Sequence, residues 1–554
     1  MSTASAVNYK EIIDNAIKAI HARTFYAQYA ESPKAYGEDA PKAGLDTFNK
    51  QLGKQFCGLQ QQHPVAWVGE EASPYTGKQL GITYPVFETD TLIVRAGRAF
   101  TAWKQVSVEQ RAEILVDALE RVKNRFFEIA YATHHTTGQS FVMSFQASGP
   151  HASDRALEAL AMGYEELNRF PSNVVWEKPM GKASVVLQKQ FKPIPKGIAL
   201  VIGCSTFPTW NSVPGLFASL ITGNSVIVKP HPKSVYAIAI VVAEIQAALL
   251  AKGVDANVCQ LAVDSSTKLI TKELAEHPLV KLIDYTGGSA FGSYVESLPG
   301  KTTFTEKAGV NSVILDSVAD LKPVVQNLSF AVSLYSGQMC TAPQNFFIPA
   351  GGIKQGNTII PYEEVKKALV DAIGGIANHP QMGPGTLGAI QNPATVKRVN
   401  SLKDLDATIL LEPKAIANAE FPEARTCSPI VLEVDAKDSG IYEEELFGPI
   451  VLIIKTKDTA QSIELAKHMA EKHGAITFSA YTTDEAVANT ITEELESVFA
   501  PVSLNLTGMI WVNQHAGFSD FHVTGGNPAG NASFTNPEYV NKRFVWVGHR
   551  RVNP

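Results

Sequence analysis

The stretch Gly197-Ile-Ala-Leu-Val-Ile-Gly203 is a continuous apolar run bounded by glycines, and it decides the fold class. A run of this length without alternation is typical of a strand that is buried on both faces of a sheet. Residues 211–221 after it predict a helix, and residues 225–229 predict the next strand. Strands that are spaced by helices form parallel sheets through right-handed crossovers. The sequence therefore predicts an α/β fold.

The same alternation continues on both sides of this stretch. A long helix is predicted over residues 235–252, with two more strands over residues 258–263 and 281–286. Residues 306–505 alternate again and predict a second α/β domain, with strands over residues 311–315, 345–348, 430–434 and 450–455 and helices near residues 319–333, 362–373 and 460–472. Residues 1–85 contain a predicted helix over residues 10–20 but no chemical motif, so they receive no role.

The composition excludes several classes of protein. The 554 residues include 48 Lys and Arg against 54 Asp and Glu, so the formal net charge is −6 and no global basic field favours nucleic acid or an anionic membrane. The five cysteines are scattered and show neither a disulfide framework nor the spacing of a zinc site. The longest apolar run, Val235 to Ala243, is too short to span a bilayer, and the N-terminus lacks a signal-peptide pattern. We expect a soluble cytoplasmic protein with neither a nucleic-acid nor a membrane partner.

Two chemical signals lie at the ends of predicted strands, where ligands bind in open α/β sheets. Lys229 ends its strand and projects into that crevice, although most lysines are simply solvated. Thr286-Gly-Gly-Ser-Ala-Phe-Gly292 lies between a strand and a helix, where glycines let a ligand approach the backbone and a helix N-terminus favours an anion. A tight strand–helix turn explains the same glycines equally well.

Two further signals carry reactive groups. Cys340 lies among small residues between a predicted helix and a strand, and Glu306 precedes it by 34 residues. Glu443-Glu-Glu-Leu-Phe-Gly-Pro449 ends in a rigid turn that would aim Glu445 and Phe447 into a cleft. Taken singly, these residues have ordinary explanations: a buried inert thiol, a surface carboxylate and a solvated helix end.

In this order, the signals resemble the aldehyde dehydrogenase superfamily over about residues 90–525. The spacing between Glu306 and Cys340 is the family's spacing between general base and nucleophile. Three further stretches resemble a bacterial branch associated with phenylacetate degradation, the PaaN type: residues 34–38 (KAYGE), 73–77 (SPYTG) and 518–528 (FSDFHVTGGNP). The superfamily resemblance implies a Rossmann-type parallel-sheet cofactor domain, an α/β catalytic domain and a small oligomerisation hairpin.

The resemblance also implies a reaction. The thiolate of Cys340 would attack an aldehyde, hydride would pass to NAD(P), and a water activated by Glu306 would hydrolyse the thioester to the acid. The PaaN branch implies a CoA-linked semialdehyde from aromatic ring cleavage, and Glu306 favours water over CoA as acyl acceptor. The implied cofactor contacts are Lys229 at the adenosine ribose, Gly287 and Gly288 under the pyrophosphate, Glu445 at the nicotinamide ribose, Phe447 beside the nicotinamide, and Phe207 of the Phe-Pro pair.

The sequence departs from the family pattern at two positions. Thr206 stands where the family places an asparagine that donates to the oxyanion, so Thr206, Asn211 or the Cys340 backbone N–H would supply that donor. Pro232 stands where NAD-selective members often carry an acidic residue, and His231 and Lys233 lie beside it. We therefore expect NADP to be preferred, with NAD as the alternative acceptor.

The domain boundaries follow from these assignments. We expect an N-terminal extension over residues 1–85, an NAD(P)-binding domain over 86–305 interrupted by an oligomerisation hairpin at 174–195, a catalytic domain over 306–505, and a C-terminal segment over 506–554 that contributes to the cleft and to oligomerisation. A homodimer or a dimer of dimers is expected by analogy. Two alternatives stay open: a non-catalytic binding protein that keeps this fold, and a thiol esterase that needs no cofactor.

Overall fold

The apolar run forms strand β5 (Ile198–Ile202), which lies at the centre of a five-stranded parallel sheet. The structure is a computed structural model that describes residues 8–508, 517–518, 522–532, 534 and 536–552. The sheet has the order β7-β6-β5-β8-β9, and its other strands are β6 (Ser225–Lys229), β7 (Cys259–Leu261), β8 (Val280–Thr286) and β9 (Thr302–Glu306). Every residue of β5 is buried, as the unbroken apolar run predicts.

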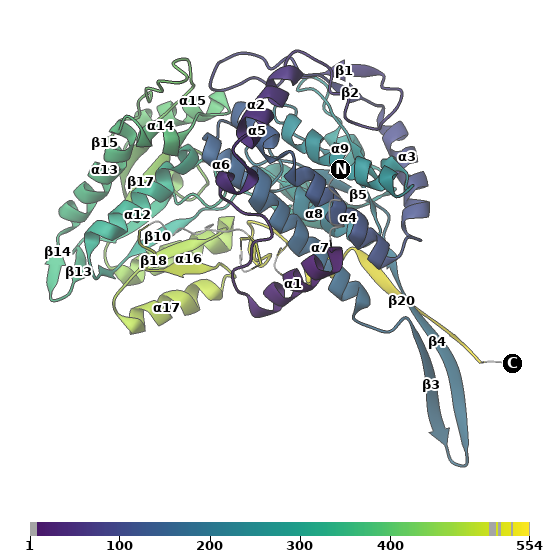
Figure 1. Ribbon diagram of the computed structural model, residues 1–554. Helices are drawn as coiled ribbons and strands as arrows, with labels where there is room; N and C mark the ends of the chain where they lie inside the picture. Colours follow the sequence, from purple (N-terminus) through teal and green to yellow (C-terminus); the bar gives the residue numbers. More distant parts are fainter. Residues whose placement is uncertain (1–7, 509–516, 519–521, 533, 535, 553–554) are drawn as a thin grey trace.

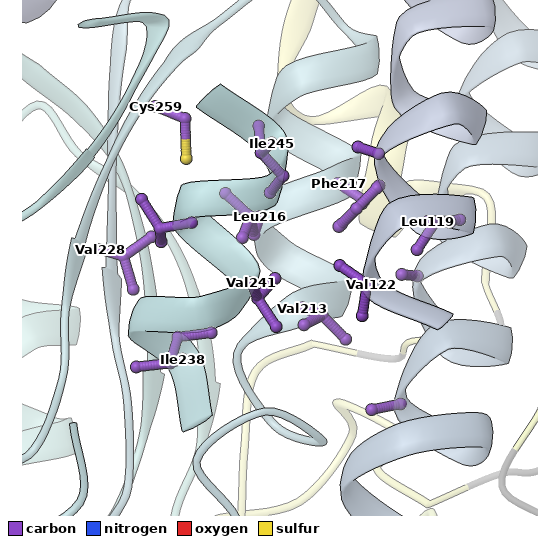
Figure 2. Close-up of a cluster of buried hydrophobic side chains, with 14 of the residues drawn as sticks. Leu119, Val122, Val213, Leu216, Phe217, Val228, Ile238, Val241, Ile245 and Cys259 are labelled. Atoms are coloured by element: carbon purple, nitrogen blue, oxygen red, sulfur yellow. The ribbon is translucent and has the colours of Figure 1, made fainter. Parts of the chain in front are cut away.

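Helices cover both faces of this sheet. One face packs against α8 (Val213–Ile221) and α9 (Tyr236–Ala251), and α4 (Val108–Lys123) packs on these two helices. Apolar side chains of the three helices form one cluster with those of β6 and β7 (Figure 2). The opposite face packs against α3 (Thr89–Trp103), α10 (Thr271–Glu276) and α11 (Ser289–Ser297). Ser107 and Gln110 form a capping box at the start of α4. Helix α8 begins two residues later than predicted, with Pro214 in its first turn, and so leaves Asn211 outside the helix.

The second α/β unit is a seven-stranded sheet with the order β15-β16-β17-β12-β10-β18-β19, parallel except for the pair β15 and β16. Its strands are β10 (Ser312–Leu315), β12 (Asn345–Pro349), β15 (Thr408–Leu411), β16 (Ile430–Asp435), β17 (Ile450–Thr456), β18 (Phe478–Tyr481) and β19 (Val502–Leu504). Helices α12 (Leu321–Ser333) and α13 (Tyr362–Asn378) cover one face, and α16 (Thr459–His473) and α17 (Glu485–Glu496) cover the other. The predicted strands and helices of this region are confirmed to within a few residues at most ends, while β15, β18, β19 and α17 were not predicted.

The predicted hairpin is present as β3 (Asn173–Met180) and β4 (Ala183–Pro195), which project from the body (Figure 1). The C-terminal strand β20 (Phe544–Arg551) pairs antiparallel with β4 and completes a three-stranded sheet. Several large apolar side chains of this sheet are exposed: Val175, Met180, Val185, Val186, Ile194, Val545 and Val547.

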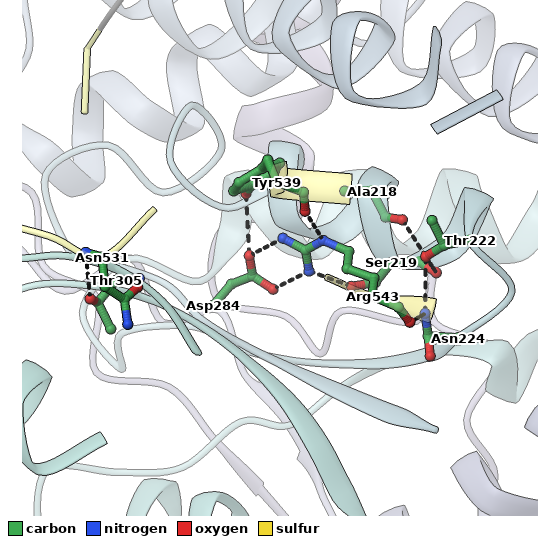
Figure 3. Close-up of polar contacts among 9 residues, drawn as sticks. All are labelled: Ala218, Ser219, Thr222, Asn224, Asp284, Thr305, Asn531, Tyr539 and Arg543. Carbon is green, nitrogen blue, oxygen red and sulfur yellow. Dashed lines mark hydrogen bonds and ion pairs between the residues drawn. The ribbon is translucent and has the colours of Figure 1, made fainter. Parts of the chain in front are cut away.

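The C-terminal segment is attached to the five-stranded sheet just before β20. The Arg543 guanidinium, which has no exposed surface, donates two hydrogen bonds of 2.6 and 2.7 Å to the Asp284 carboxylate of β8 (Figure 3). Arg543 also donates to the Ser219 hydroxyl, and Tyr539 donates to Asp284. This network joins β8, α8 and α18 (Glu538–Asn541).

Residues 8–85 pack onto the helices that precede and flank the five-stranded sheet. Helix α1 (Tyr9–Ala22) lies on α4 and α7 (Ala152–Asn168), and α2 (Ala40–Gln51) lies on α5 (Phe126–Thr137). The buried Glu71 carboxylate accepts the backbone N–H groups of Val235 and Tyr236 at the start of α9, and it also accepts the Tyr84 hydroxyl. The remaining elements are β1 (Ala66–Val68), β2 (Tyr84–Val86), β11 (Ser317–Val318), β13 (Ile353–Gln355), β14 (Thr358–Ile360), α6 (Phe141–Gln146), α14 (Met382–Leu387) and α15 (Pro393–Ser401).

The division of the chain into four segments and the cytoplasmic location both stay predictions. In the described part of the chain, none of the helices combines the length and apolar character needed to cross a membrane.

Candidate active site

Cys340 is positioned by a sharp turn that follows α12. Tyr335 and Ser336 both have φ of 51°, in the left-handed region that side chains rarely adopt. Both residues are buried and held there: the Tyr335 hydroxyl donates to the Thr137 carbonyl at 2.6 Å, and the Ser336 hydroxyl donates to the Leu387 carbonyl at 2.9 Å. The turn thus depends on contacts with two distant segments and fixes the loop that carries the thiol.

Glu306 and Cys340 lie together, as predicted, and His522 lies between them. Glu306 is the last residue of β9, and its Oε1 is 2.9 Å from His522 Nε2. The same Nε2 is 3.1 Å from Cys340 Sγ. The His522 ring is buried and meets the Trp210 ring edge-on, with centroids 4.8 Å apart. The site therefore combines a thiol, an imidazole and a carboxylate in direct contact.

The electrostatics of this trio favour an ionised base and a protonated thiol in the resting site. Burial raises the pKa of Glu306, but the ion pair and hydrogen bond with His522, with smaller contributions from Cys340 and Arg155, outweigh it and lower the pKa overall. Burial raises the pKa of Cys340 well above its usual value, and the charge of Glu306 raises it further. A positive or hydrogen-bond-donating group is needed to form the thiolate here.

The two side chains predicted as oxyanion donors, Thr206 and Asn211, lie in the loop between β5 and α8. Asn211 Nδ2 donates to Glu306 Oε2 at 3.1 Å, and Asn211 Oδ1 lies 3.6 Å from the Cys204 thiol. The Thr206 carbonyl accepts a hydrogen bond from Gln139. Of the predicted donors, Asn211 thus orients the base. The assignment of Thr206 to the oxyanion stays a prediction.

The predicted phosphate turn has space for a ligand. Gly288 begins α11, and a Cβ placed on it would meet no atom within 4 Å. A Cβ on Gly287 would lie only 2.5 Å from the Tyr285 hydroxyl, which itself donates to the Gly288 carbonyl. Glycine is thus required at 287 by packing, while Gly288 leaves the backbone open to close approach by a pyrophosphate.

The predicted ribose contacts lie at the ends of β6 and β7. Lys229 is buried, and its Nζ is 2.7 Å from Asp264 Oδ1 and donates to the Pro230 carbonyl. His231 is half-buried, and burial with the charges of Lys229 and Lys233 lowers its pKa to about 4, so it is neutral at pH 7. Lys233 is exposed. Among the predicted contact residues here, Lys229 and Lys233 are thus the cations that could face a phosphate.

The Glu445–Phe447 turn faces the same site. Burial raises the pKa of Glu445 to about 7, the Glu306 charge adds to the rise, and Arg398 opposes it. The turn is fixed by the Leu446 N–H, which donates to Gln344 Oε1 at 2.6 Å, and by Arg398, which donates to the Phe447 carbonyl at 2.7 Å. The Glu445 and Phe447 side chains are half-buried. These contacts suit groups that present a carboxylate and a ring to a cofactor.

The last predicted cofactor residue, Phe207, is half-buried. Its ring makes edge contacts with Trp210 and Tyr335, at centroid distances of 6.1 and 5.8 Å. These contacts place Phe207 between the loop before α8 and the turn that leads to Cys340.

Comparisons with known proteins agree with this geometry. Residues 70–543 match the family model "Aldehyde dehydrogenase family". A crystal structure described as an NAD-dependent aldehyde dehydrogenase from Burkholderia multivorans is 41% identical, covers 100% of both chains and has a TM-score of 0.96. A succinate-semialdehyde dehydrogenase [NADP(+)] of Deinococcus radiodurans is 25% identical over 82% of this chain and 88% of its own. An alpha-ketoglutaric semialdehyde dehydrogenase of Bacillus subtilis is 23% identical over 68% of this chain and 74% of its own.

The chain belongs to the aldehyde dehydrogenase family. The predicted superfamily, its α/β fold and an NAD(P)-dependent aldehyde dehydrogenase activity are thereby confirmed.

Sequence reasoning missed two residues of the site. His522 is 182 residues from Cys340 and 216 from Glu306, and it stood only within a stretch used for the narrower resemblance. Its neighbours 519–521 in that stretch lie outside the described residues. Asp264 follows the strand predicted over residues 258–263, so its position at the same sheet edge as Lys229 could have been predicted from the sequence.

Proposed function

We propose that this chain oxidises a semialdehyde to the carboxylic acid through a thioester on Cys340, with Glu306 as the base for hydrolysis and NAD(P) as hydride acceptor. The observation that carries the proposal is the contact of the Cys340 thiol and the Glu306 carboxylate with one imidazole nitrogen, at 3.1 and 2.9 Å. The two curated relatives named above act on semialdehydes, which supports this substrate class.

In the first half of the reaction Cys340 loses its proton to the Glu306 carboxylate, and the sulfur attacks the aldehyde carbon. The C=O π bond becomes an oxyanion, stabilised by backbone or side-chain donors near Cys340. NAD(P) would supply the hydride acceptor when bound, and the residues that would hold it are Gly287, Gly288, Lys229, Glu445 and Phe447. Loss of hydride from the same carbon leaves the acyl group as a thioester on Cys340.

In the second half Glu306, returned to the ionised form by release of its proton to solvent, removes a proton from water as the water oxygen attacks the thioester. The C–S bond then breaks and Cys340 leaves as a thiolate, which is reprotonated before the next cycle. Asn211 holds one oxygen of Glu306 at 3.1 Å, so the base keeps a fixed orientation while it takes up the proton.

The narrower substrate is a CoA-linked semialdehyde of the kind formed by aromatic ring cleavage. The retained Glu306 supports hydrolysis at the aldehyde end, so the thioester to CoA would remain intact in the product. For the hydride acceptor, NADP is proposed to be preferred, because position 232 carries proline in place of an acidic residue and the cationic side chain of Lys233 follows it in the chain. The exposed apolar residues of β3, β4 and β20 support a homodimer or dimer of dimers.

A substrate panel tests these statements. Short aliphatic aldehydes, acidic semialdehydes, aromatic aldehydes and CoA-linked aldehydes are each assayed with NAD and NADP by absorbance of the reduced cofactor, with Cys340→Ala as control. We expect the highest kcat/KM for a semialdehyde and no turnover in the control. Reduced cofactor with none of the aldehydes would favour a binding protein, and ester hydrolysis that needs no cofactor, with no aldehyde oxidation, would favour the thiol esterase.

A further inference from the structure

His522 presents one nitrogen to two groups that carry negative charge during the proposed reaction. Its Nε2 is 2.9 Å from Glu306 Oε1 and 3.1 Å from Cys340 Sγ. An imidazole nitrogen has either one hydrogen or one lone pair in the ring plane. A lone pair facing the Glu306 carboxylate would be repelled, so we assign the hydrogen to Nε2. One N–H thus lies within reach of both acceptors.

We propose that His522 is a third catalytic residue, which donates its Nε2–H to the Cys340 thiolate while the aldehyde is attacked and to the Glu306 carboxylate while the thioester is hydrolysed. This inference rests on the proposed function for its second part only. Contact with the thiolate is a property of the resting enzyme and needs neither aldehyde nor cofactor.

The need for such a donor follows from the burial of the thiol. Removing its proton creates a negative sulfur close to the Glu306 carboxylate in a site that excludes most water, which burial and like charge both oppose. A donor at 3.1 Å stabilises the sulfur anion by a charge-assisted hydrogen bond. The family pattern stated above assigns no residue to this function.

The two halves of the reaction use the same hydrogen in turn. Once Cys340 is acylated, its sulfur is neutral and is a poor acceptor, so the Nε2–H is left to Glu306 alone. The carboxylate is then kept ionised, which is the state that removes a proton from water. Because Nε2 already lies 3.1 Å from Cys340 Sγ and 2.9 Å from Glu306 Oε1, the change of acceptor requires no large rearrangement.

The surroundings hold the imidazole without supplying a competing charge in direct contact. Trp210 packs edge-on against the ring, and the Arg155 guanidinium lies 3.7 Å from the centroid of the Trp210 ring. Cys204 and Glu445 act on Cys340 through their charges. His522 also lines a cavity of about 40 Å³ together with Asn211 and Glu306, which is room for a few water molecules.

The test uses two substitutions that separate the donor from the ring. His522→Phe keeps an aromatic ring against Trp210 and removes the N–H, while His522→Gln keeps an amide N–H. The rate of Cys340 alkylation by iodoacetamide is measured from pH 6 to 10 in full-length enzyme without aldehyde or cofactor, by mass spectrometry of the Cys340 peptide. Cys340→Ala identifies the background from the other cysteines.

We expect the His522→Phe profile to move to higher pH by at least one unit, so that alkylation at pH 7.5 is about tenfold slower. His522→Gln should lie between this variant and the unsubstituted enzyme, a rescue that a purely structural role would not give. A His522→Phe profile that coincides with that of the unsubstituted enzyme overturns the proposal, and so does a Gln variant no better than Phe when circular dichroism shows both folded.

The second acceptor is tested with 4-nitrophenyl acetate, which acylates Cys340 without cofactor. The release of nitrophenolate gives an acylation phase and a hydrolysis phase, and we expect both to slow in His522→Phe. Unchanged hydrolysis of the acyl-enzyme would overturn the transfer of the donor to Glu306. If alkylation shifts as expected and no aldehyde is oxidised by any variant, the proposed function fails while the contact between His522 and the thiolate stands.

Discussion

Lys229 Nζ lies 2.7 Å from Asp264 Oδ1, and both side chains are buried where β6 and β7 end. The lysine that was predicted to contact a ribose therefore already has an anionic partner. Burial lowers the pKa of Lys229 and the charge of Asp264 raises it, with a net lowering. Because Asp264 partly neutralises Lys229, it determines how much positive charge the ends of β6 and β7 present to a phosphorylated ribose.

Removal of that carboxylate should increase the preference for NADP. In Asp264→Asn the lysine has lost its partner and is free to pair with a 2′-phosphate, so kcat/KM for NADP relative to NAD should rise about fivefold, or about 1 kcal/mol. Initial rates at several concentrations of each cofactor give this ratio, with the nearby Lys268→Ala as control. For the unsubstituted enzyme we expect kcat/KM to be higher with NADP than with NAD. An equal or higher kcat/KM with NAD would show this preference to be wrong.

Cofactor affinity should depend on pH through Glu445. Its pKa is raised to about 7, so the carboxyl is mostly protonated below pH 7, and above pH 7 it becomes a carboxylate, which accepts stronger, charge-assisted hydrogen bonds from ribose hydroxyls. The dissociation constant should therefore increase several-fold as pH falls from 8 to 6, because the more weakly binding protonated form becomes dominant. Titration of reduced-cofactor fluorescence measures it. Glu445→Gln should show little of this dependence, and an unchanged dependence in that variant would contradict the assignment.

Loss of the base should separate the two halves of the reaction. Glu306→Gln keeps the Cys340 thiol and a side chain of similar size, but it cannot take a proton from water. We expect one equivalent of reduced cofactor to form per site, more slowly than normal because Glu306 also accepts the Cys340 proton, followed by steady turnover about 10²–10⁴ times slower than normal. Stopped-flow absorbance resolves the two phases. Glu444→Gln, at an exposed position, should behave as the unsubstituted enzyme.

The ion pair between Arg543 and Asp284 should be important for stability. Replacing the fully buried Arg543 by Met leaves Asp284 as an uncompensated buried charge, which typically costs about 3–5 kcal/mol. The midpoint of urea denaturation should fall accordingly. The adjacent Lys542→Ala removes an exposed side chain and should change it little. Equal midpoints for both variants would contradict the structural role of Arg543.

Charge on the projecting hairpin should disrupt the expected oligomer. Val186 of β4 is 43% exposed, and Val186→Asp places a carboxylate among the apolar residues proposed to be covered by a second chain. Light scattering should then give the mass of one chain, 59.8 kDa, in place of a dimer or larger assembly. Val65→Asp alters an exposed valine far from the hairpin and should keep the assembly. A monomeric unsubstituted protein would itself refute the expectation.

The sequence predicted the elements whose pattern is local. The strand at 198–202 and the helix at 236–251 were readable because burial on all sides leaves unbroken apolar runs. The pair of Glu306 and Cys340 was readable through a fixed spacing. His522 was not, because its place between them depends on chain segments far apart, and one histidine in a polar stretch carries no local signal. The contacts of Arg543 with Asp284, 259 residues apart, escaped for the same reason.

The cap that Glu71 provides for α9 links the order of synthesis to the order of folding. The carboxylate that accepts from Tyr236 N–H precedes that residue by 165 positions, so the N-terminal segment leaves the ribosome well before its partner is made. Before residue 236 emerges, residues 8–85 can lie on α4, α5 and α7, but α9 is not yet made. During translation the Glu71 carboxylate therefore lacks its two backbone donors, and the N-terminal segment is fully fastened only after α9 has been made.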